Sequence, residues 1–182
     1  MPEPFACRPS GERFEVASRG DFVPGRLWQR ASVSGPLPLV LIVPALGAGK
    51  DASEVEALGD ALAAAGWAAA AIDLPLQGTR ASAKLSARLA GCATEAPAEP
   101  SQRLLWDEFV RQAALDLAAT LAALRPRQAL DAERVGCVAF ASGAAAAEAW
   151  AKREPRVRLV RAEPGAAPAQ LVAQLRHALA AR

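Results

Sequence analysis

The side chains in this sequence that could do covalent or acid–base chemistry are few, and two of them follow apolar runs. Ser142 comes shortly after the run that ends at Phe140, and Asp73 directly follows the run that ends at Ile72. A serine is a useful nucleophile only when an adjacent base takes its proton, and histidine is the usual base. His177 is the single histidine of the chain. Hydrolysis at Ser142 therefore depends on whether a base reaches it.

The surroundings of His177 argue against a catalytic role. The apolar residues of the last predicted helix recur at helical spacing, and they are Leu171, Leu175 and Leu179. His177 falls nearly opposite this stripe, so we expect a solvated surface histidine. Glu163 precedes the turn signal Pro164-Gly165, which favours a polar turn residue over a catalytic acid.

Cysteine usage predicts neither disulfides nor metal binding. Cys7, Cys92 and Cys137 are odd in number and far apart, and no CxxC pair occurs. Cys137 lies inside an apolar strand pattern, which favours burial as a small hydrophobe over use as a nucleophile. With one histidine a His-rich metal site is excluded, so we expect no metal and no cofactor.

Composition and charge indicate one compact domain. The 182 residues are 52% hydrophobic and 22% charged, which excludes disorder over most of the length. The net charge is +2 and like charges form no run, so nucleic-acid or membrane-surface binding is not expected. No apolar stretch reaches the roughly 20 residues of a membrane span. We expect a cytoplasmic protein with a flexible N-terminus over 1–11 and a single domain over 12–182.

Strands are predicted first as a hairpin and then as buried runs. Residues 13–17 and 22–28, joined by Arg19-Gly20-Asp21, are typical of an antiparallel hairpin. The later apolar runs predict buried parallel strands, and these cover residues 37–43, 67–73, 134–140 and 157–160. Alanine dominates the second of these runs, so its helical propensity is misleading there.

Helices are predicted between these strands. Asp51, with Glu54 three residues later, predicts a capping box that starts the first helix, and Gly66 predicts its left-handed end. Further helices are expected over 101–125, 143–152 and 168–181, and residues 79–100 are expected to be a long loop with a short helix over 82–89. This strand–helix alternation predicts an α/β fold with its chemistry in the loops 44–50, 73–80 and 140–143.

Three segments carry a resemblance to the α/β-hydrolases of the dienelactone hydrolase and esterase type. Residues 39–51 are similar to that family's strand and His-Gly loop, residues 66–78 resemble its Asp-x-Pro-Gly-His-Gly segment, and residues 131–144 resemble the strand that enters the nucleophile elbow. The resemblance implies a mostly parallel three-layer α/β/α sheet of about six strands, begun by the antiparallel hairpin and C-terminally shortened by about two strands.

The resemblance leaves the nucleophile position empty. An elbow needs small residues two before and two after the nucleophile, and Ala139 and Gly143 meet this rule only if Ala141 is the nucleophile position. Alanine has no nucleophilic atom. The alternative frame makes Ser142 the nucleophile, but it places Phe140 in the crowded turn.

The oxyanion donors of the family are backbone N–H groups, which need no particular side chain. Carried over by position, they are the amides of Ser142 and Leu46, so a small carbonyl or anionic ligand is a partner that the resemblance allows. The family's His-Gly is Pro44-Ala45 here, which changes the loop. Asp73 is expected to organise its loop by hydrogen bonds. Candidate binding residues are therefore Leu46, Asp73, Ala141, Ser142 and Gly143.

A P-loop phosphate site is a minor alternative, because the segment 47–50, Gly-Ala-Gly-Lys, lies between a strand and a helix. Against it, Pro44 stands at the first glycine position and has no N–H, and Asp51 replaces the Ser or Thr that holds magnesium.

Two functional hypotheses remain open: a catalytically degenerate hydrolase relative with a binding or interaction role, and an active carboxylic-ester or thioester hydrolase that uses Ser142. The shortened sheet also leaves an edge with three arginines, Arg156, Arg158 and Arg161. We expect the final helix to cover one face of this edge, or a second copy of the chain to pair with it as a homodimer.

Overall fold

The computed structural model describes residues 12–30, 35–94, 99–126 and 130–180. Its sheet has six strands in the order β1-β2-β4-β3-β5-β6. The strands are β1 (Glu12–Ser18), β2 (Asp21–Trp28), β3 (Leu37–Val43), β4 (Ala68–Ile72), β5 (Leu130–Phe140) and β6 (Arg158–Ala162). The pairs β3·β4, β3·β5 and β5·β6 are parallel, whereas β1·β2 and β2·β4 are antiparallel. The predicted mostly parallel sheet of about six strands with an N-terminal hairpin is confirmed.

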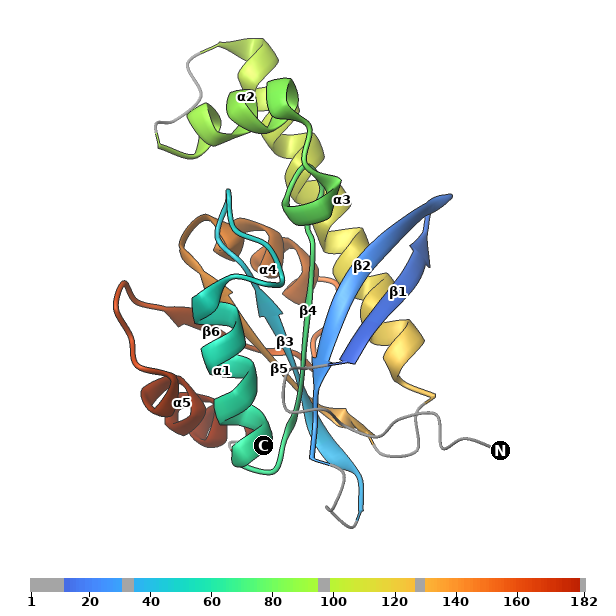
Figure 1. Ribbon diagram of the computed structural model, residues 1–182, viewed down its shortest axis with the longest axis vertical. Coiled ribbons are helices and arrows are strands. Elements are labelled where there is room, and N and C mark those ends of the chain that lie inside the picture. Colours follow the sequence, from blue (N-terminus) through green and yellow to red (C-terminus); the bar gives the residue numbers. More distant parts are fainter. Residues whose placement is uncertain (1–11, 31–34, 95–98, 127–129, 181–182) are drawn as a thin grey trace.

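Helices cover both faces of this sheet. The helices are α1 (Ser53–Ala64), α2 (Ala83–Thr94), α3 (Pro100–Leu124), α4 (Ala144–Ala151) and α5 (Pro168–Ala180), of which α2 packs on α3. One core cluster joins the sheet to α3 and α4, and a second joins its other face to α1 and α5. In Figure 1, α2 and the first turns of α3 extend beyond the end of β4, above the sheet. The result is the three-layer arrangement that the sequence predicted.

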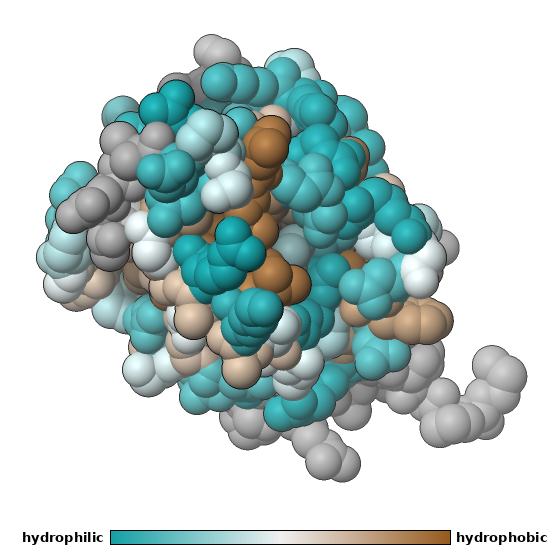
Figure 2. All heavy atoms as spheres, turned by 90° about the horizontal axis from the view of Figure 1, so that it is seen from above, coloured by the Kyte–Doolittle hydropathy of each residue, from teal (hydrophilic) through white to brown (hydrophobic). Residues whose placement is uncertain are grey.

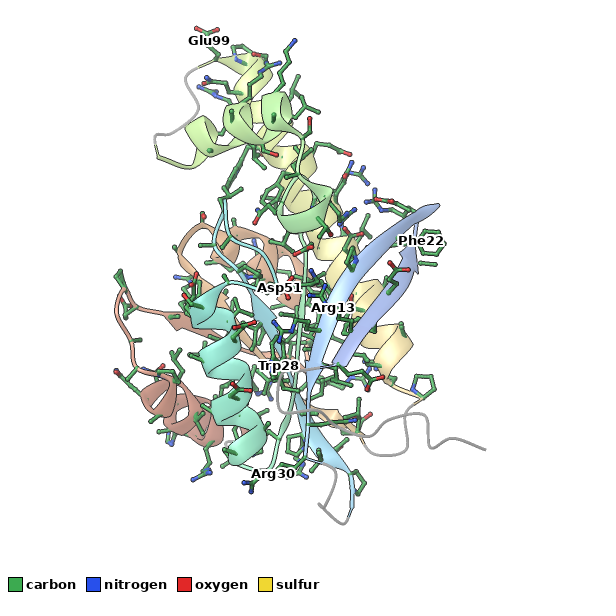
Figure 3. The ribbon with its side chains drawn as sticks, viewed as in Figure 1. Arg13, Phe22, Trp28, Arg30, Asp51 and Glu99 are labelled. Carbon is green, nitrogen blue, oxygen red and sulfur yellow. The ribbon has the colours of Figure 1, made fainter. Side chains whose placement is uncertain are left out.

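The backbone angles of Arg19 and Gly20 form the turn of the hairpin. Arg19 has φ 53° and Gly20 has φ 83°, and Ser18 pairs with Asp21 across the turn. Two successive positive φ values define the tight turn whose twist matches that of paired strands. Phe22, just after the turn, is 64% exposed and points away from the body of the molecule (Figure 3). The predictions for 1–11, including Cys7, lie outside the described residues.

The end of α1 is as predicted, and its start is not. Gly66 has φ 83°, its N–H donates to the Ala63 carbonyl, and the Trp67 N–H donates to the Leu62 carbonyl. This pair of hydrogen bonds closes a helix with glycine just past its end. The helix begins instead with Ala52 as its N-cap residue, without a side-chain cap. The capping box at Asp51 is wrong, because that carboxylate lies beside cations and not over the first helical turn.

Two elements, β4 and α2, show how packing overrides local preference. β4 has the sequence AAAAI, yet it is a fully buried strand, because β2 and β3 pair with both of its edges. The segment predicted as a long loop with a helix over 82–89 contains the longer α2. Leu89 and Cys92, three residues apart, are both buried where α2 packs on α3, which extends the helix beyond the expected end.

A buried carboxylate ties the hairpin to α3. Asp116 of α3 is fully buried, and it accepts hydrogen bonds from the Ser18 hydroxyl at 2.7 Å and the Arg80 guanidinium at 2.8 Å. Arg19 lies 3.6 Å from the same carboxylate. We call Ser18, Arg19, Arg80 and Asp116 the Asp116 clasp. It joins three separate segments: the hairpin, the loop after β4 and the long helix.

The last strand lies at the edge of the sheet within the described residues. β6 pairs with β5, and α5 packs against it, which confirms that the final helix covers one face there. Arg161 pairs with Glu148 at 2.7 Å, and Arg156 pairs with Glu133 and Glu154. Across the described residues, no helix is long and apolar enough to pass through a bilayer.

Candidate functional site

Three loops meet at the carboxyl edge of the parallel strands, where sheets of this kind place their chemistry. They are residues 44–50 after β3, residues 73–80 after β4, and the short 3-10 helix η2 (Ala141–Gly143) after β5. A second 3-10 helix, η1 (Gly78–Arg80), lies inside the middle loop. The predicted site residues belong to these loops, so the structure brings together the loops that the sequence selected.

The turn from β5 to α4 is sharp and strained. Ala141 has φ +40°, a left-handed backbone conformation that costs an L residue about 1–2 kcal/mol. A Cβ on Gly143 would lie 2.3 Å from the Pro44 carbonyl oxygen, so only glycine fits there. Ala139 is fully buried two residues before the turn. The backbone thus has the tight strand-to-helix geometry of a nucleophile elbow, with an alanine at its tip.

Ser142 lies next to this tip, and its hydroxyl is engaged. The Leu46 N–H donates to Ser142 Oγ at 2.9 Å, across from the loop after β3. The resemblance made Leu46 N–H a candidate oxyanion donor, but in the structure this donor is already satisfied by the serine. The Ser142 hydroxyl therefore bridges the two loops, and among the residues that the structure describes no base lies in hydrogen-bond contact with it.

Asp73 organises the loops around β3 and β4. One carboxylate oxygen accepts the Lys50 N–H at 3.0 Å, and the other accepts the Thr79 N–H at 3.0 Å and the Thr79 hydroxyl at 2.8 Å. The Lys50 ammonium lies 3.1 Å from Asp73 and 2.8 Å from Asp51. The predicted loop-organising role of Asp73 is what these contacts perform. We call Asp73, Lys50 and Thr79 the Asp73 hub.

The contacts of Asp73 lower its pKa, and they require glycine at two neighbouring positions. Burial raises the pKa of Asp73, but the hydrogen bonds from the backbone N–H groups and the side chains of Thr79 and Lys50 together outweigh it and hold that pKa below its usual range. A Cβ on Gly78 would lie 2.1 Å from the Asp73 carboxylate, and one on Gly49 would lie 2.8 Å from it. These glycines therefore let two loops close over one charged group.

The predicted phosphate-binding segment is part of this hub. Lys50 is 2% exposed and its ammonium is held by two carboxylates. A phosphate would have to compete with Asp51 and Asp73 for that charge, so the geometry does not favour a P-loop. A hollow of about 550 Å³ adjoins the hub, and it is lined by Arg13, Phe14, Glu15, Pro24, Gly25, Lys50 and Thr79. Arg13 lies beside Asp51 there, as Figure 3 shows.

The other candidate residues lie outside the three loops of the site. His177 is exposed on α5, whose buried residues are Leu171, Val172 and Leu175. Glu163 is exposed and its carbonyl accepts the Ala166 N–H at 3.0 Å in a turn, as predicted. Cys137 is buried in β5, where burial raises the pKa of its thiol. Within the described residues, no three His, Cys, Asp or Glu side chains gather as a metal site.

A second hollow lies between the hairpin tip, α2 and α3. Its volume is about 320 Å³, and its apolar lining comes from Pro75, Leu76, Leu85, Leu105 and Phe109. Figure 2, which views the molecule from above, shows a narrow strip of hydrophobic groups between hydrophilic ones on this side. Arg80, which lines the hollow, is already paired with Asp21 and Asp116.

The sequence analysis named Lys50 only as part of a possible P-loop, and it did not single out Thr79 or Gln77. Lys50 and Thr79 bind Asp73, and the buried Gln77 amide lies against the loop after β3, with its nitrogen 3.0 Å from the Ala45 carbonyl and 2.8 Å from the Ala48 carbonyl in the orientation that satisfies both. The sequence signal for the hub was a glycine in each of the two loops, Gly49 and Gly78, together with an aspartate, Asp73, directly after β4.

Comparisons with known proteins support the fold. No protein-family model matches the chain, and no curated protein matches it either. An esterase from an Arctic intertidal metagenomic library matches 82% of this chain and 58% of its own, at 22% identity and a TM-score of 0.62. A dienelactone hydrolase-like promiscuous phosphotriesterase from metagenomic libraries matches 84% of this chain and 58% of its own, at 22% identity and a TM-score of 0.61.

A Klebsiella pneumoniae structure assigned to the dienelactone hydrolases matches more of its own length. It aligns over 94% of this chain and 80% of its own, at 18% identity and a TM-score of 0.61. The chain spans less than two thirds of the first two structures. With the sheet order, these matches show that the chain has the α/β-hydrolase fold that these structures share.

Proposed function

We propose that this chain is a catalytically silent α/β-hydrolase-fold protein that binds a small carbonyl or anionic ligand at its elbow. The observation that carries the proposal is Ala141, which has the left-handed backbone of an elbow tip and no nucleophilic atom. The N-terminus of α4 directs the positive end of its dipole toward this turn, which supports a ligand oxygen there.

The side chains near the elbow support the absence of catalytic activity. A serine hydroxyl near its free pKa is a weak nucleophile without an adjacent base. Within the described part of the chain, Ser142 Oγ accepts the Leu46 N–H, which is a donor and cannot take a proton. His177 faces solvent on α5. A single histidine on an outer helix surface does not serve as the base for Ser142.

The second candidate function is an active ester or thioester hydrolase that uses Ser142. Two observations favour it: Ser142 lies at the carboxyl edge of the sheet, and the structural neighbours include esterases.

A cytoplasmic location, a single domain over 12–182 and a homodimer through the β6 edge stay predictions.

Serine-directed labelling separates the two functions. Wild-type protein, Ser142→Ala and the matched surface control Ser53→Ala are treated with a fluorophosphonate probe and assayed with p-nitrophenyl acetate. We expect all three to give the same background, because no hydroxyl is activated. Labelling or ester turnover that Ser142→Ala abolishes and Ser53→Ala preserves would establish the hydrolase and reject the silent assignment.

Restoring the missing hydroxyl tests the elbow directly. Ala141→Ser is expected to give at most a slow, stoichiometric acylation with p-nitrophenyl acetate, because no base takes the proton. Adding His177→Ala should leave this rate unchanged. Sustained turnover by Ala141→Ser that His177→Ala removes would show that a base does reach the elbow. Mass spectrometry of the acyl adduct and the release of p-nitrophenolate provide the two readouts.

A further inference from the structure

The Leu46 N–H is a donor that its own loop does not use. Residues 45–48 form a turn in which the Ala48 N–H donates to the Ala45 carbonyl at 3.1 Å, with Gly47 at φ 83°. Leu46 is an interior residue of this turn, so its N–H is left to point out of it. The partner it finds is Ser142 Oγ at 2.9 Å, 96 residues later in the chain.

Both sides of this contact are held in place. On the elbow side, Gly143 packs so closely on the Pro44 carbonyl that a Cβ would overlap it, and the backbone of Ala141 is fixed at φ +40°. On the loop side, the buried Gln77 amide lies against the carbonyls of Ala45 and Ala48. The donor and the hydroxyl therefore meet between two rigid segments and not on a mobile surface.

We propose that Ser142 is an internal plug: its hydroxyl oxygen occupies the position in which a carbonyl or carboxylate oxygen of a ligand would accept the Leu46 N–H. This inference rests on the proposed function, since a plug holds its hydroxyl as an acceptor and not as a nucleophile. A hydroxyl, a carbonyl and a carboxylate oxygen all accept the same N–H donor, so they compete for it. Ser142 thereby sets which ligands reach Leu46, because a ligand must first displace the hydroxyl.

Ligand binding at the Leu46 amide tests the plug. Acetate is titrated into ¹⁵N-labelled wild type, Ser142→Ala and the control Ser53→Ala, and the Leu46 resonance is followed. An exchangeable neutral hydrogen bond is worth about fivefold to tenfold in an equilibrium constant. We expect the apparent dissociation constant of acetate at Leu46 to fall by about that factor in Ser142→Ala and to stay unchanged in Ser53→Ala. An equal response in all three proteins would overturn the proposal.

A kinetic test uses the restored hydroxyl and gives a readout of the plug that does not depend on acetate binding. Ala141→Ser and Ala141→Ser/Ser142→Ala are compared in single-turnover reactions with p-nitrophenyl acetate. The introduced oxygen bonds to the acyl carbon, p-nitrophenolate leaves, and the hydroxyl proton passes to buffer. Freeing the Leu46 donor for the developing oxyanion should speed acylation about tenfold in the double variant.

The outcomes separate this inference from the proposed function. Equal or slower acylation in the double variant, while wild type has no turnover, rejects the plug and leaves the silent assignment standing. Wild-type turnover that Ser142→Ala abolishes rejects the silent assignment itself. Ser142→Thr retains a hydroxyl, and it should bind acetate at Leu46 as weakly as wild type does.

Discussion

The elbow and the Asp73 hub lie at the same edge of one sheet, yet their geometries depend on different kinds of residue. At the elbow, the geometry depends on what is absent, because Gly143 fits against Pro44 only without a Cβ. At the hub, the geometry depends on what is present, because Asp73 accepts hydrogen bonds from two loops and binds a buried ammonium. The strand-to-helix turn needs small residues, whereas the hub needs particular functional groups.

This difference explains how a hydrolase-like edge keeps its shape around an alanine. The elbow turn needs only small residues, so its backbone conformation does not change when the residue at its tip has no hydroxyl. The loops opposite it are fixed by Asp73, Lys50 and Thr79, none of which depends on Ala141. Loop architecture and nucleophilic chemistry are therefore separable in this fold, and substitutions in the two regions should have effects of different size.

The largest effect is expected at the hub. Asp73→Ala leaves the Lys50 ammonium buried with one fewer carboxylate and removes the acceptor of three further donors. Breaking a buried ion pair by removing one partner costs about 3–5 kcal/mol. We expect a loss of this size in the free energy of unfolding, measured with urea at pH 7. The exposed Asp60→Ala is the control, and a loss below about 1 kcal/mol in Asp73→Ala would contradict a structural role.

The pH dependence of this effect has a definite sign. The pKa of Asp73 is lowered in the folded protein, because the backbone and side-chain hydrogen bonds from Thr79 and Lys50 together outweigh burial. A lowered folded-state pKa stabilises above the unfolded pKa of about 3.9, and this stabilisation is lost as the pH falls through the folded value. Urea unfolding from pH 5 to pH 2 should therefore show Asp73→Asn losing less stability than wild type. A parallel decline in both proteins would show that this carboxylate carries no part of the acid sensitivity.

A smaller loss is expected at the elbow. Gly143→Ala places a Cβ against the Pro44 carbonyl, and overpacking of this kind costs about 1–3 kcal/mol. Gly91→Ala on α2 is the matched control, because nothing lies within 4 Å of its Cβ position, and it should gain up to about 1 kcal/mol from helix propensity. Thermal and urea unfolding measure both. Equal effects in the two variants would mean that the elbow and Pro44 are not in close contact.

The smallest effect is a gain. Ala141→Gly removes the penalty of a left-handed alanine, and it should stabilise the protein by about 0.5–1 kcal/mol once the greater freedom of the unfolded glycine is subtracted. The same substitution at Ala145 in α4 should instead destabilise by about 0.5–1 kcal/mol. If Ala141→Gly destabilises as Ala145→Gly does, the tip of the elbow is not strained.

Local sequence patterns predicted the elements that depend on local physics. Gly66 ends α1 because only glycine takes its backbone angles without cost, and that requirement is visible in one residue. The strand predicted over 67–73 from its flanking turns is β4 (Ala68–Ile72), although alanine favours helices. The small residues Ala139 and Gly143 located the elbow, because steric limits of a tight turn are also local.

Interactions between distant segments could not be read in this way. Asp51 has the right spacing for a capping box, but Lys50 and Arg26 attract its carboxylate, and Arg26 is brought there by the sheet. The Ser142–Leu46 contact joins loops 96 residues apart, so the sequence placed both at one edge without indicating that one blocks the other. α2 extends beyond its predicted end because α3 buries Cys92.

The Asp116 clasp joins distant parts of the chain, and we expect those parts to open as one cooperative unit. Asp116 is fully buried on α3, and its charge is balanced by groups from the hairpin and from the loop after β4. If the hairpin separated alone, that charge would remain inside the protein with fewer partners, which is costly. We therefore expect partial opening to be suppressed, and we expect the hairpin, η1 and the centre of α3 to exchange their amide protons through a single shared event.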